Sequence, residues 1–543
     1  MIEGMVIGYS RKGFFVQDDL FHEGQSASSG IFVYAAEPRP ARGRRVQVWG
    51  RVADFYKEEG DKPVTQLHSE GFSEVEGPAI PIQAIELAAL LPEESGKQAA
   101  FLNSIEGMLC VIKAGARFLA PSNPFGDYVL CTKTFYEQNS ALHAGGGLRV
   151  DPNDPHRWFP SMRALDLRHA PSVNVGDTLG LDAAGPLNYR AKAYQIAVQG
   201  RIRIDAADLD MQSPAVTESN AEEISVMTLN TFNLDPKKER ASYVNDPRRD
   251  IDDDLADKRF DFIACDIVKA GCPDIIALQE MQDDDGAEIT EVVKASKNHR
   301  TLIAAVQKRA KQVKSGNPPD YAFAELAPVA GEDGGQPGGN IRNSYLYNTK
   351  NISLVHGETG AHLIRLCQQD EAFADSRKPL LAQFEHRQSG HSLTVINIHL
   401  ASKRQQRSLF AIDSPAYDER EAMRIRQAEL VKAVMDQLAE AGLDCYVTGD
   451  FNDTEFSRTL AAFTGSDHIN LVDKLQASER YDYNHRGKLQ VLMHGIVPKA
   501  LRNFEQPYYQ VLHGNELQGV QPGSAGIKAS DHAYVIARFL PRA

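Results

Sequence analysis

Two oxygen-bearing side chains follow a short apolar run near residue 450. The run Cys445-Tyr446-Val447 is typical of a buried strand end, and Gly449 is followed by Asp450 and, two residues later, by Asn452. Because side chains alternate along a strand, Asp450 and Asn452 are expected to point the same way while Phe451 turns into the core. A carboxylate beside an amide suits a hard cation such as Mg²⁺ and a phosphate oxygen. The alternative is an Asx-type turn with no chemical role.

Four further apolar runs adjoin polar side chains. Strand-like segments end at Asn230, at Glu280 and at His399, and Asp531-His532 precedes a last apolar run. Each of these, taken alone, is equally consistent with a satisfied polar residue at a sheet edge. Five in succession are hard to explain by chance, so we interpret them as parts of one site.

The elements around these segments alternate between helix and strand. Apolar residues recur at helical spacing within 255–270 and again within 418–441. Both predicted helices lead directly into strands, at 274–278 and 445–448. This alternation predicts an α/β domain over residues 223–541, with its functional groups at the strand ends.

The N-terminal half is instead built from short alternating runs separated by turns, which predicts β-rich modules. We expect a small barrel or sandwich over 1–90, a second β-rich module over 91–210 and a polar linker over 211–222. If the barrel binds single strands, the candidate side chains are aromatic and basic: Phe15, Tyr34, Trp49, Arg39, Arg42, Arg44 and Arg45. The alternative is that the aromatic rings are core and the arginines belong to a solvated loop.

Charge and composition narrow the function. The net charge of −14 argues against a protein that binds nucleic acid by bulk electrostatics, but carboxylates gathered around a metal would themselves raise the acidic count. No segment has the apolar length of a membrane span. The six cysteines form no C-x-x-C pair and mostly lie in apolar runs, so we interpret them as small buried hydrophobes.

The set and order of the polar strand ends closely resemble the endonuclease/exonuclease/phosphatase superfamily, the deoxyribonuclease I-like metal-dependent phosphoesterases. Shorter motifs agree with the resemblance: Gly338-Gly339-Asn340-Ile341-Arg342, Arg377-Lys378-Pro379-Leu380, Arg426-Gln427-Ala428, and Tyr481-x-Tyr483 before Gly487. The order of runs at 13–18, 30–34 and 46–52 resembles the OB-type domain that precedes the catalytic domain in some bacterial secreted nucleases. The resemblance implies OB-like all-β modules followed by a four-layered α/β sandwich with the site at one edge of its sheets.

The resemblance also implies a role for each site residue. Glu280 would be the principal Mg²⁺ ligand, supported by Asn230 and Asp531, with Mn²⁺ or Ca²⁺ as other candidate ions. Asp450 would orient or deprotonate the attacking water, and Asn452 would bind a phosphate oxygen. The remaining groups would surround the scissile phosphate: His399, His532 and Arg377, with Asn340 supporting His399. Carboxylates alone would repel a phosphate, so the metal, histidines and arginine must supply positive charge.

One position departs from the family pattern. The family has Leu-Asp-His before the last strands, where the aspartate orients the terminal histidine, and this chain has Leu492-Met493-His494. A methionine is only a weak hydrogen-bond acceptor, so it cannot do this. Either His532 is poorly oriented, or a neighbour such as Asp482 or His494 replaces the aspartate.

Three functions follow from these observations. The first is a Mg²⁺-dependent endonuclease or phosphodiesterase acting on nucleic acid, DNA before RNA. The second is the same chemistry on a phospholipid headgroup or a phosphorylated small molecule. The third is a nucleic-acid-binding protein whose site has decayed at Met493. Nothing implies an obligate protein partner. The residues after Met1 resemble no secretory signal, so we expect a cytoplasmic protein as written, or a secreted one if the natural start lies upstream.

Overall fold

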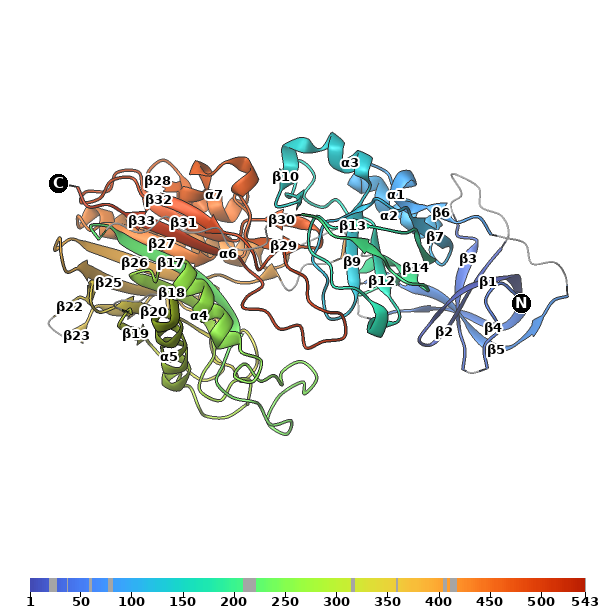
Figure 1. The fold of residues 1–543 in the computed structure, drawn as a ribbon, viewed down its shortest axis with the longest axis horizontal. Helices are drawn as coiled ribbons and strands as arrows, with labels where there is room; N and C mark the ends of the chain where they lie inside the picture. The colour runs from blue at the N-terminus through green and yellow to red at the C-terminus, as the bar shows by residue number, and fades with distance from the viewer. Residues whose placement is uncertain are drawn as a thin grey trace.

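Three regions follow one another along the longest axis of the molecule (Figure 1). The computed structural model describes residues 1–18, 27–36, 38–57, 61–76, 82–208, 221–313, 318–357, 360–403, 408–410 and 418–542. The predicted linker at 211–222 lies almost wholly outside these residues. None of the described helices is long and apolar enough to cross a membrane.

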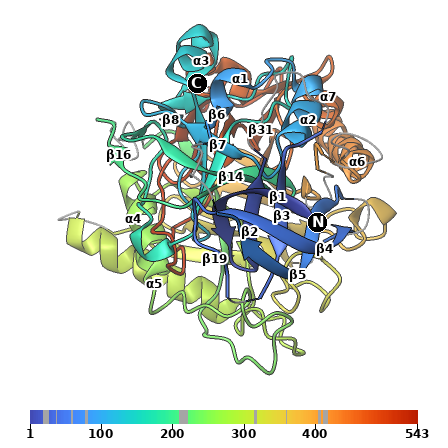
Figure 2. The same cartoon turned by 90° about the vertical axis from the view of Figure 1, so that its right-hand side faces the viewer.

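The first region is a closed five-stranded barrel, which faces the viewer in Figure 2. Its strands pair in the order β1-β2-β3-β5-β4, and β3 runs parallel to β5. Their bounds are β1 Ile2–Ser10, β2 Gly13–Gln17, β3 Gly30–Tyr34, β4 Arg45–Phe55 and β5 Val64–Glu74. Alternate residues of these strands, such as Phe14 and Val16, fill the interior. The β-barrel expected from the spacing of the short runs is therefore present.

The candidate stacking residues of the barrel divide into two groups. Phe15 is buried and packs against Phe32 at 5.0 Å between ring centroids, so it is a core ring, as the alternative interpretation has it, and not a candidate for stacking on bases. Tyr34 and Trp49 are 42 % and 40 % exposed. Arg39 donates hydrogen bonds to the carbonyl oxygens of a neighbouring turn, which gives it a structural role.

The second region is a nine-stranded sheet with three short helices. Its strand order is β16-β13-β8-β9-β12-β15-β14-β7-β6. The bounds are β6 Ile85–Glu86, β7 Leu109–Ile112, β8 Arg117–Phe118, β9 Asp127–Cys131, β12 Ser161–Ala164, β13 Thr178–Leu179, β14 Ala183–Arg190, β15 Ala193–Val198 and β16 Ile204–Asp205. Also present are α1 Leu87–Leu90, α2 Ser95–Ser104, α3 Lys133–Gln138 and the hairpin β10 His143–Ala144 with β11 Gly147–Leu148. We call residues 82–208 the middle module.

The third region contains two sheets packed face to face. One has the order β19-β20-β18-β17-β33-β32, and the other has β21-β25-β26-β27-β31-β28 with β24 beside β25. The first comprises β17 Ile224–Leu234, β18 Ile275–Met281, β19 Tyr321–Glu325, β20 Arg342–Asn348, β32 Tyr508–Leu512 and β33 Tyr534–Phe539. The second comprises β21 Ile352–Leu354, β24 Leu363–Arg365, β25 Leu380–His386, β26 Ser392–His399, β27 Cys445–Asp450, β28 His468–Asn470 and β31 Met493–Pro498.

Helices cover the outer faces of both sheets, which gives four layers. On the first sheet lie α4 Arg259–Lys269 and α5 Ser296–Val313, and on the second lie α6 Glu421–Glu440 and α7 Arg458–Thr464. Between the sheets is a shared apolar core to which Val226 and Tyr345 contribute from one side and Phe384 and Val395 from the other. The helix predicted within 255–270 begins at Arg259, because Lys258 adopts a left-handed conformation. The helix predicted within 418–441 is α6.

Two segments of the third region dock onto the middle module. In the hairpin of β29 Tyr483–His485 and β30 Lys488–Gln490, the Leu489 carbonyl accepts a hydrogen bond from Val150 N at 2.8 Å. In the segment 517–523, the carbonyl of Val520 accepts one from Ser122 Oγ at 2.8 Å. The other described hairpin, β22 His356–Gly357 with β23 Gly360–Ala361, lies at the far end of the region (Figure 1). The middle module is thus attached to the side of the domain that carries the hairpin β29–β30.

Candidate active site

The polar strand ends meet at one edge of the two packed sheets. Strand β17 runs parallel to β18, and β26 runs parallel to β27, so the carboxyl ends of each pair lie together. The register places His399 opposite Asp450. The segment before β33 adds Asp531 and His532 to the same cavity, whose volume is about 710 Å³. Of the nine residues predicted for the site, the structure places seven in the lining of this cavity: Glu280, Arg377, His399, Asp450, Asn452, Asp531 and His532.

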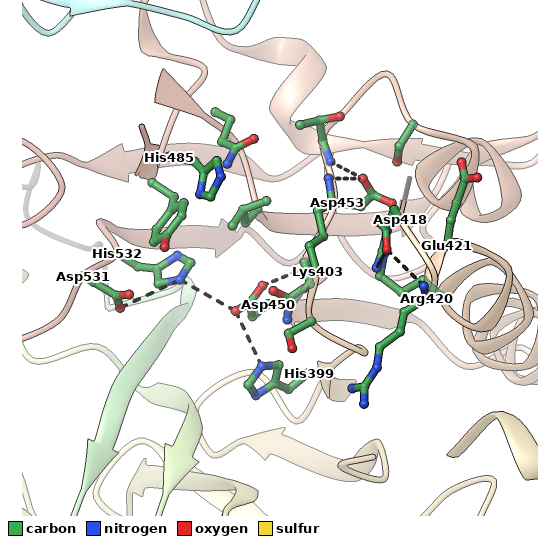
Figure 3. A pocket seen from close by; sticks show the side chains of 18 of the residues that line it. His399, Lys403, Asp418, Arg420, Glu421, Asp450, Asp453, His485, Asp531 and His532 are labelled. Atoms are coloured by element: carbon green, nitrogen blue, oxygen red, sulfur yellow. Dashed lines mark hydrogen bonds and ion pairs between the residues drawn. The ribbon is translucent and has the colours of Figure 1, made fainter. Parts of the chain in front are cut away.

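Asp450 lies between two histidines (Figure 3). Its Oδ2 atom is 3.7 Å from Nε2 of His399 and 3.7 Å from Nε2 of His532. The amide of Asn230 donates to the same oxygen at 3.3 Å, and Oδ1 accepts a hydrogen bond from Asn452 N at 2.8 Å. Burial raises the pKa of Asp450, and the neighbouring His532 opposes that shift. The carboxylate is therefore fixed in position with one oxygen directed at the space between the histidines.

The same corner has the donor set of a divalent cation. One ligand atom each from Glu280, His399 and Asp450 lie within 4.8 Å of one another. Burial raises the pKa of Glu280, and the negative charges of Asp531 and Asp450 raise it further. Asp531 Oδ1 is buried and has no hydrogen-bond partner among the described residues. These carboxylates lie close enough for their negative charges to repel one another. Carboxylate oxygens together with one imidazole fit a cation such as Mg²⁺ or Mn²⁺.

The backbone at this corner is strained. Glu280 has φ +59° and Asn452 has φ +53°. These are left-handed backbone conformations that residues other than glycine rarely adopt. Asn230 lies between the two carboxylates and donates to Glu280 Oε1 at 3.2 Å. Strain of this kind persists only where the surroundings impose it, and it is concentrated at functional sites.

His532 is oriented by Asp482, which resolves the question raised by Met493. Oδ1 of Asp482 is 3.2 Å from Nδ1 of His532, and Oδ2 accepts hydrogen bonds from the backbone N–H groups of Leu492 and Met493. Burial lowers the pKa of His532, but Asp531, Asp482 and Asp450 outweigh that effect and raise it to about 10. The imidazole is therefore protonated at neutral pH.

The other candidate for this role, His494, does not take it. Its ring nitrogens contact Asn470 Nδ2 and the carbonyl of Asp453, both at 2.9 Å. The side chain of Met493 is fully buried in the core between the sheets. The carboxylate thus comes from a position 11 residues earlier in the chain, and the backbone hydrogen bonds of Asp482 place it beside the methionine.

Asn340 does not support His399, and this expectation is corrected. Its Nδ2 atom donates to Asp283 Oδ2, at 2.8 Å, and to two carbonyl oxygens, and its Oδ1 atom accepts from Gly331 N. Asn340 has φ +43°, so the amide fastens a loop beside the cavity instead of entering it. Arg377 does line the cavity, and one of its Nη atoms donates to the carbonyl of Leu400 at 2.8 Å.

Sequence reasoning missed several other groups that line the cavity. His156 comes from the middle module, and Lys403, His485 and Lys488 come from loops and the hairpin β29–β30. Tyr483 stacks on His532 with 4.7 Å between ring centroids. The only signal in the sequence was the Tyr481-x-Tyr483 motif, because the cationic residues follow no periodic pattern.

Two family models match parts of the chain. Residues 227–490 match the model of the Endonuclease/Exonuclease/phosphatase family, and residues 61–206 match that of a Domain of unknown function (DUF8508). No curated protein matches the chain.

Three solved structures are similar to parts of the chain. A humanized D. rerio TDP2 with 14 mutations is 17 % identical, with coverage of 59 % of this chain and 99 % of that one and a TM-score of 0.36. An endonuclease/exonuclease/phosphatase family protein from Bacteroides thetaiotaomicron is 16 % identical (58 % and 97 %, TM-score 0.35). The human Nocturnin catalytic domain is 14 % identical (60 % and 97 %, TM-score 0.36).

The match over residues 227–490 spans the strands that carry Asn230, Glu280, His399 and Asp450. These strands form the packed pair of sheets whose edge holds the acidic and imidazole groups described above. The C-terminal domain of this chain belongs to the endonuclease/exonuclease/phosphatase family.

Proposed function

We propose that the protein is a divalent-metal-dependent phosphodiesterase that hydrolyses nucleic acid, DNA before RNA. The observation that carries the proposal is the position of Asp450 between His399 and His532, near Glu280, in the lining of a cavity. A base, a protonated acid and a metal corner within one cavity are the groups that phosphodiester hydrolysis needs.

Glu280 would bind the metal ion, with Asn230, Asp531 and the neighbouring His399 and Asp450 completing its surroundings. The ion, Mg²⁺ with Mn²⁺ or Ca²⁺ as alternatives, would neutralise charge on a phosphate oxygen as a Lewis acid. Its binding would also offset the mutual repulsion of the carboxylates, which raises the pKa of Glu280.

Different residues of the chain carry out different parts of the reaction. Asp450 accepts a proton from the attacking water, whose oxygen forms the new bond to phosphorus as the bond to the leaving alkoxide breaks. The imidazolium of His532, held by Asp482, stabilises the negative charge that develops on the phosphate oxygens. His399, Arg377 and Asn452 line the cavity where the other non-bridging oxygens would lie. The alkoxide leaves protonated by solvent or by one of the histidines.

The barrel belongs to the same proposal as an OB-type accessory domain. Support comes from its closed five-stranded form with one parallel pair, β3 and β5. Tyr34 and Trp49 remain exposed enough to stack on bases. The contact of Asp482 with His532 favours an intact site over the alternative of a decayed enzyme, because Asp482 offers the carboxylate that Met493 lacks.

Nicking of supercoiled plasmid in Mg²⁺, and then in Mn²⁺, tests the function. Glu280→Gln should lower the rate by about 10³-fold or more, because the change removes the principal metal ligand. The matched control is Glu440→Gln, at the exposed end of α6, which should nick like the wild type. Intact single- and double-stranded DNA and RNA after incubation with the wild type would contradict the proposal. Hydrolysis of phospholipids or phosphorylated small molecules alone would support the same chemistry on another phosphoester.

A further inference from the structure

A second cavity continues from the active site into the space between the middle module and the catalytic domain. Its volume is about 560 Å³, and we call it the crevice. Residues 120–129 and 157–161 of the middle module line one side, and residues 484–488 and 525–531 of the catalytic domain line the other. Three residues line both cavities: Phe232, Lys488 and Asp531. A substrate bound at Asp450 therefore has a direct path into the crevice.

Three cations of the crevice contact carbonyl oxygens instead of carboxylates. Lys488 Nζ donates to the Pro155 carbonyl at 2.7 Å, and Lys528 Nζ donates to the Asn515 carbonyl at 3.2 Å. Arg486 donates to the carbonyls of Ala191 and Lys192 at 3.4 and 3.5 Å. Carboxylates act on these cations as well: Asp154 favours the charged form of Lys488, Asp127 that of Arg486, and Asp531 and Glu516 that of Lys528.

Keeping these side chains charged costs free energy in the protein without a bound ligand. Burial, together with the nearby charge of Arg486, lowers the pKa of Lys488 to about 8, and burial lowers the pKa values of Arg486 and Lys528. Positive charges that repel one another in a partly dehydrated cavity are stabilised by an anion. The acidic residues that line the crevice are Asp127 and Asp531, and Asp531 belongs to the metal corner. Charge complementarity thus favours a phosphate near Lys488 and Arg486.

Exposed aromatic rings accompany these cations. Phe125, in the loop before β9, is 60 % exposed, and Phe232, at the junction of the two cavities, is 41 % exposed. Phe232 has φ +54°, and the guanidinium of Arg259 lies 5.6 Å from its ring centroid. Exposed phenyl rings beside phosphate-binding cations are the components of a single-strand nucleic-acid site, because stacking tolerates any base and requires it to be unpaired.

We propose that the crevice binds an unpaired nucleic-acid strand next to the scissile phosphate, with Lys488 and Arg486 on the adjacent phosphate and Phe125 and Phe232 against the flanking bases. The inference rests on the proposed nuclease function and specifies its substrate as single-stranded or locally unpaired. An acyl chain is disfavoured as the occupant, because it would leave the half-buried Lys488 and Lys528, and Arg486 beside them, without an anion.

Binding of a fluorescent short oligothymidylate, measured by anisotropy in EDTA, tests the proposal without cleavage. Lys488→Gln should weaken binding about tenfold and reduce the slope of log Kd against log salt by about 0.7, the value for one phosphate contact on a single strand. Phe125→Ser should weaken binding by a similar factor and leave the slope unchanged, since it removes stacking and no charge. Because Phe125 is exposed, this variant remains informative if Lys488→Gln fails to fold.

The matched control is Lys308→Gln, which removes a charge from the exposed face of α5 and should bind like the wild type. A duplex of the same length should bind at least about tenfold more weakly than the single strand, because paired bases do not present their faces. Wild-type affinity in both crevice variants, absence of oligonucleotide binding, or equal affinity for the duplex would each overturn the proposal. Binding to phosphatidylglycerol vesicles without binding to the oligonucleotide would also overturn the proposal.

Plasmid nicking separates this inference from the proposed function. Nicking by a protein whose crevice variants bind like the wild type would overturn the crevice alone. Crevice-dependent binding by a protein that cleaves no nucleic acid would overturn the nuclease function alone.

Discussion

At the scale of single residues, His532 takes its orienting carboxylate from a position in the chain other than the one in the family pattern. The position that carries aspartate in the family pattern is Met493, which packs in the core between the two sheets. Asp482 approaches from the neighbouring segment and is held by the backbone N–H groups of Leu492 and Met493. The carboxylate therefore reaches His532 from a sequence position other than the one in the family pattern.

Asp482→Asn should lower the rate of phosphodiester hydrolysis by about 10³- to 10⁴-fold, the scale seen when the orienting carboxylate of a histidine is made an amide. The amide keeps the shape of the side chain but cannot stabilise the imidazolium of His532. Single-turnover cleavage compared with the wild type at equal metal saturation measures the effect. An unchanged rate would mean that His532 does not act as a cation.

Met493→Asp is the companion variant, and it should not raise the activity of the wild type. Its carboxylate would replace an apolar side chain that is fully buried, so the free energy of unfolding should fall by about 3 kcal/mol or more. Urea unfolding measures this loss. Rescue of Asp482→Asn by Met493→Asp would show instead that the two positions are interchangeable.

At the scale of elements, short loops after the strands place the candidate catalytic groups, and buried polar contacts keep these loops in place. The guanidinium of Arg259, at the start of α4, binds Asp254 and the carbonyls of Thr231 and Phe232 just beyond Asn230. Similarly, His513, after β32, lies 2.9 Å from Glu516 and 3.4 Å from Glu479. Because these contacts join ionisable side chains, the stability of the loops depends on pH.

The loop around His513 should lose stability in mild alkali. Burial lowers the pKa of His513, but Glu479 and Glu516 outweigh that effect and raise it from 6.5 to about 9. Its stabilising contribution is therefore complete below pH 6.5 and is lost as the pH rises through 9. The free energy of unfolding should fall by about 3 kcal/mol over this range, and His513→Gln should remove that part of the fall. Urea unfolding of both proteins at several pH values measures the difference, and parallel curves would contradict the assignment.

At the scale of the whole molecule, the middle module is part of the wall of the active-site cavity. It contributes Val150, Pro155 and His156 to the cavity lining. An apolar cluster across the interface joins Ala144 and Val175 of the module to Tyr481, Leu489 and Leu517 of the catalytic domain. The module therefore both lines the cavity and packs against the hairpin β29–β30.

A chain that begins at residue 221 should be less stable than the full chain. Leu489 and Leu517 would be exposed, and burial of one such side chain contributes about 1.5–3 kcal/mol, so the domain should lose about 3 kcal/mol or more. Urea unfolding of the catalytic domain in both chains measures the loss. Mn²⁺ binding should persist in the shorter chain, because Glu280, His399 and Asp450 all lie in the catalytic domain. Equal stability would show that the interface contributes little.

The sequence by itself determined the order of elements and the chemical groups at the strand ends. Apolar periodicity predicted the helices that became α4 and α6, and the runs ending at Asn230, Glu280, His399 and Asp450 predicted the edge where they meet, because parallel strands bring their carboxyl ends together. These are local patterns, set by the two-residue period of strands and the 3.6-residue period of helices.

Only the tertiary structure decided which distant groups touch. Asp482 contacts His532 across 50 positions, Asn340 binds Asp283 in place of His399, and Phe15 is buried. The cations of the crevice likewise come from the hairpin β29–β30 and from a loop, and they follow no periodic pattern in the sequence. Such contacts depend on how the sheets, hairpin and middle module pack against one another, and packing between distant segments leaves no regular signal in the chain.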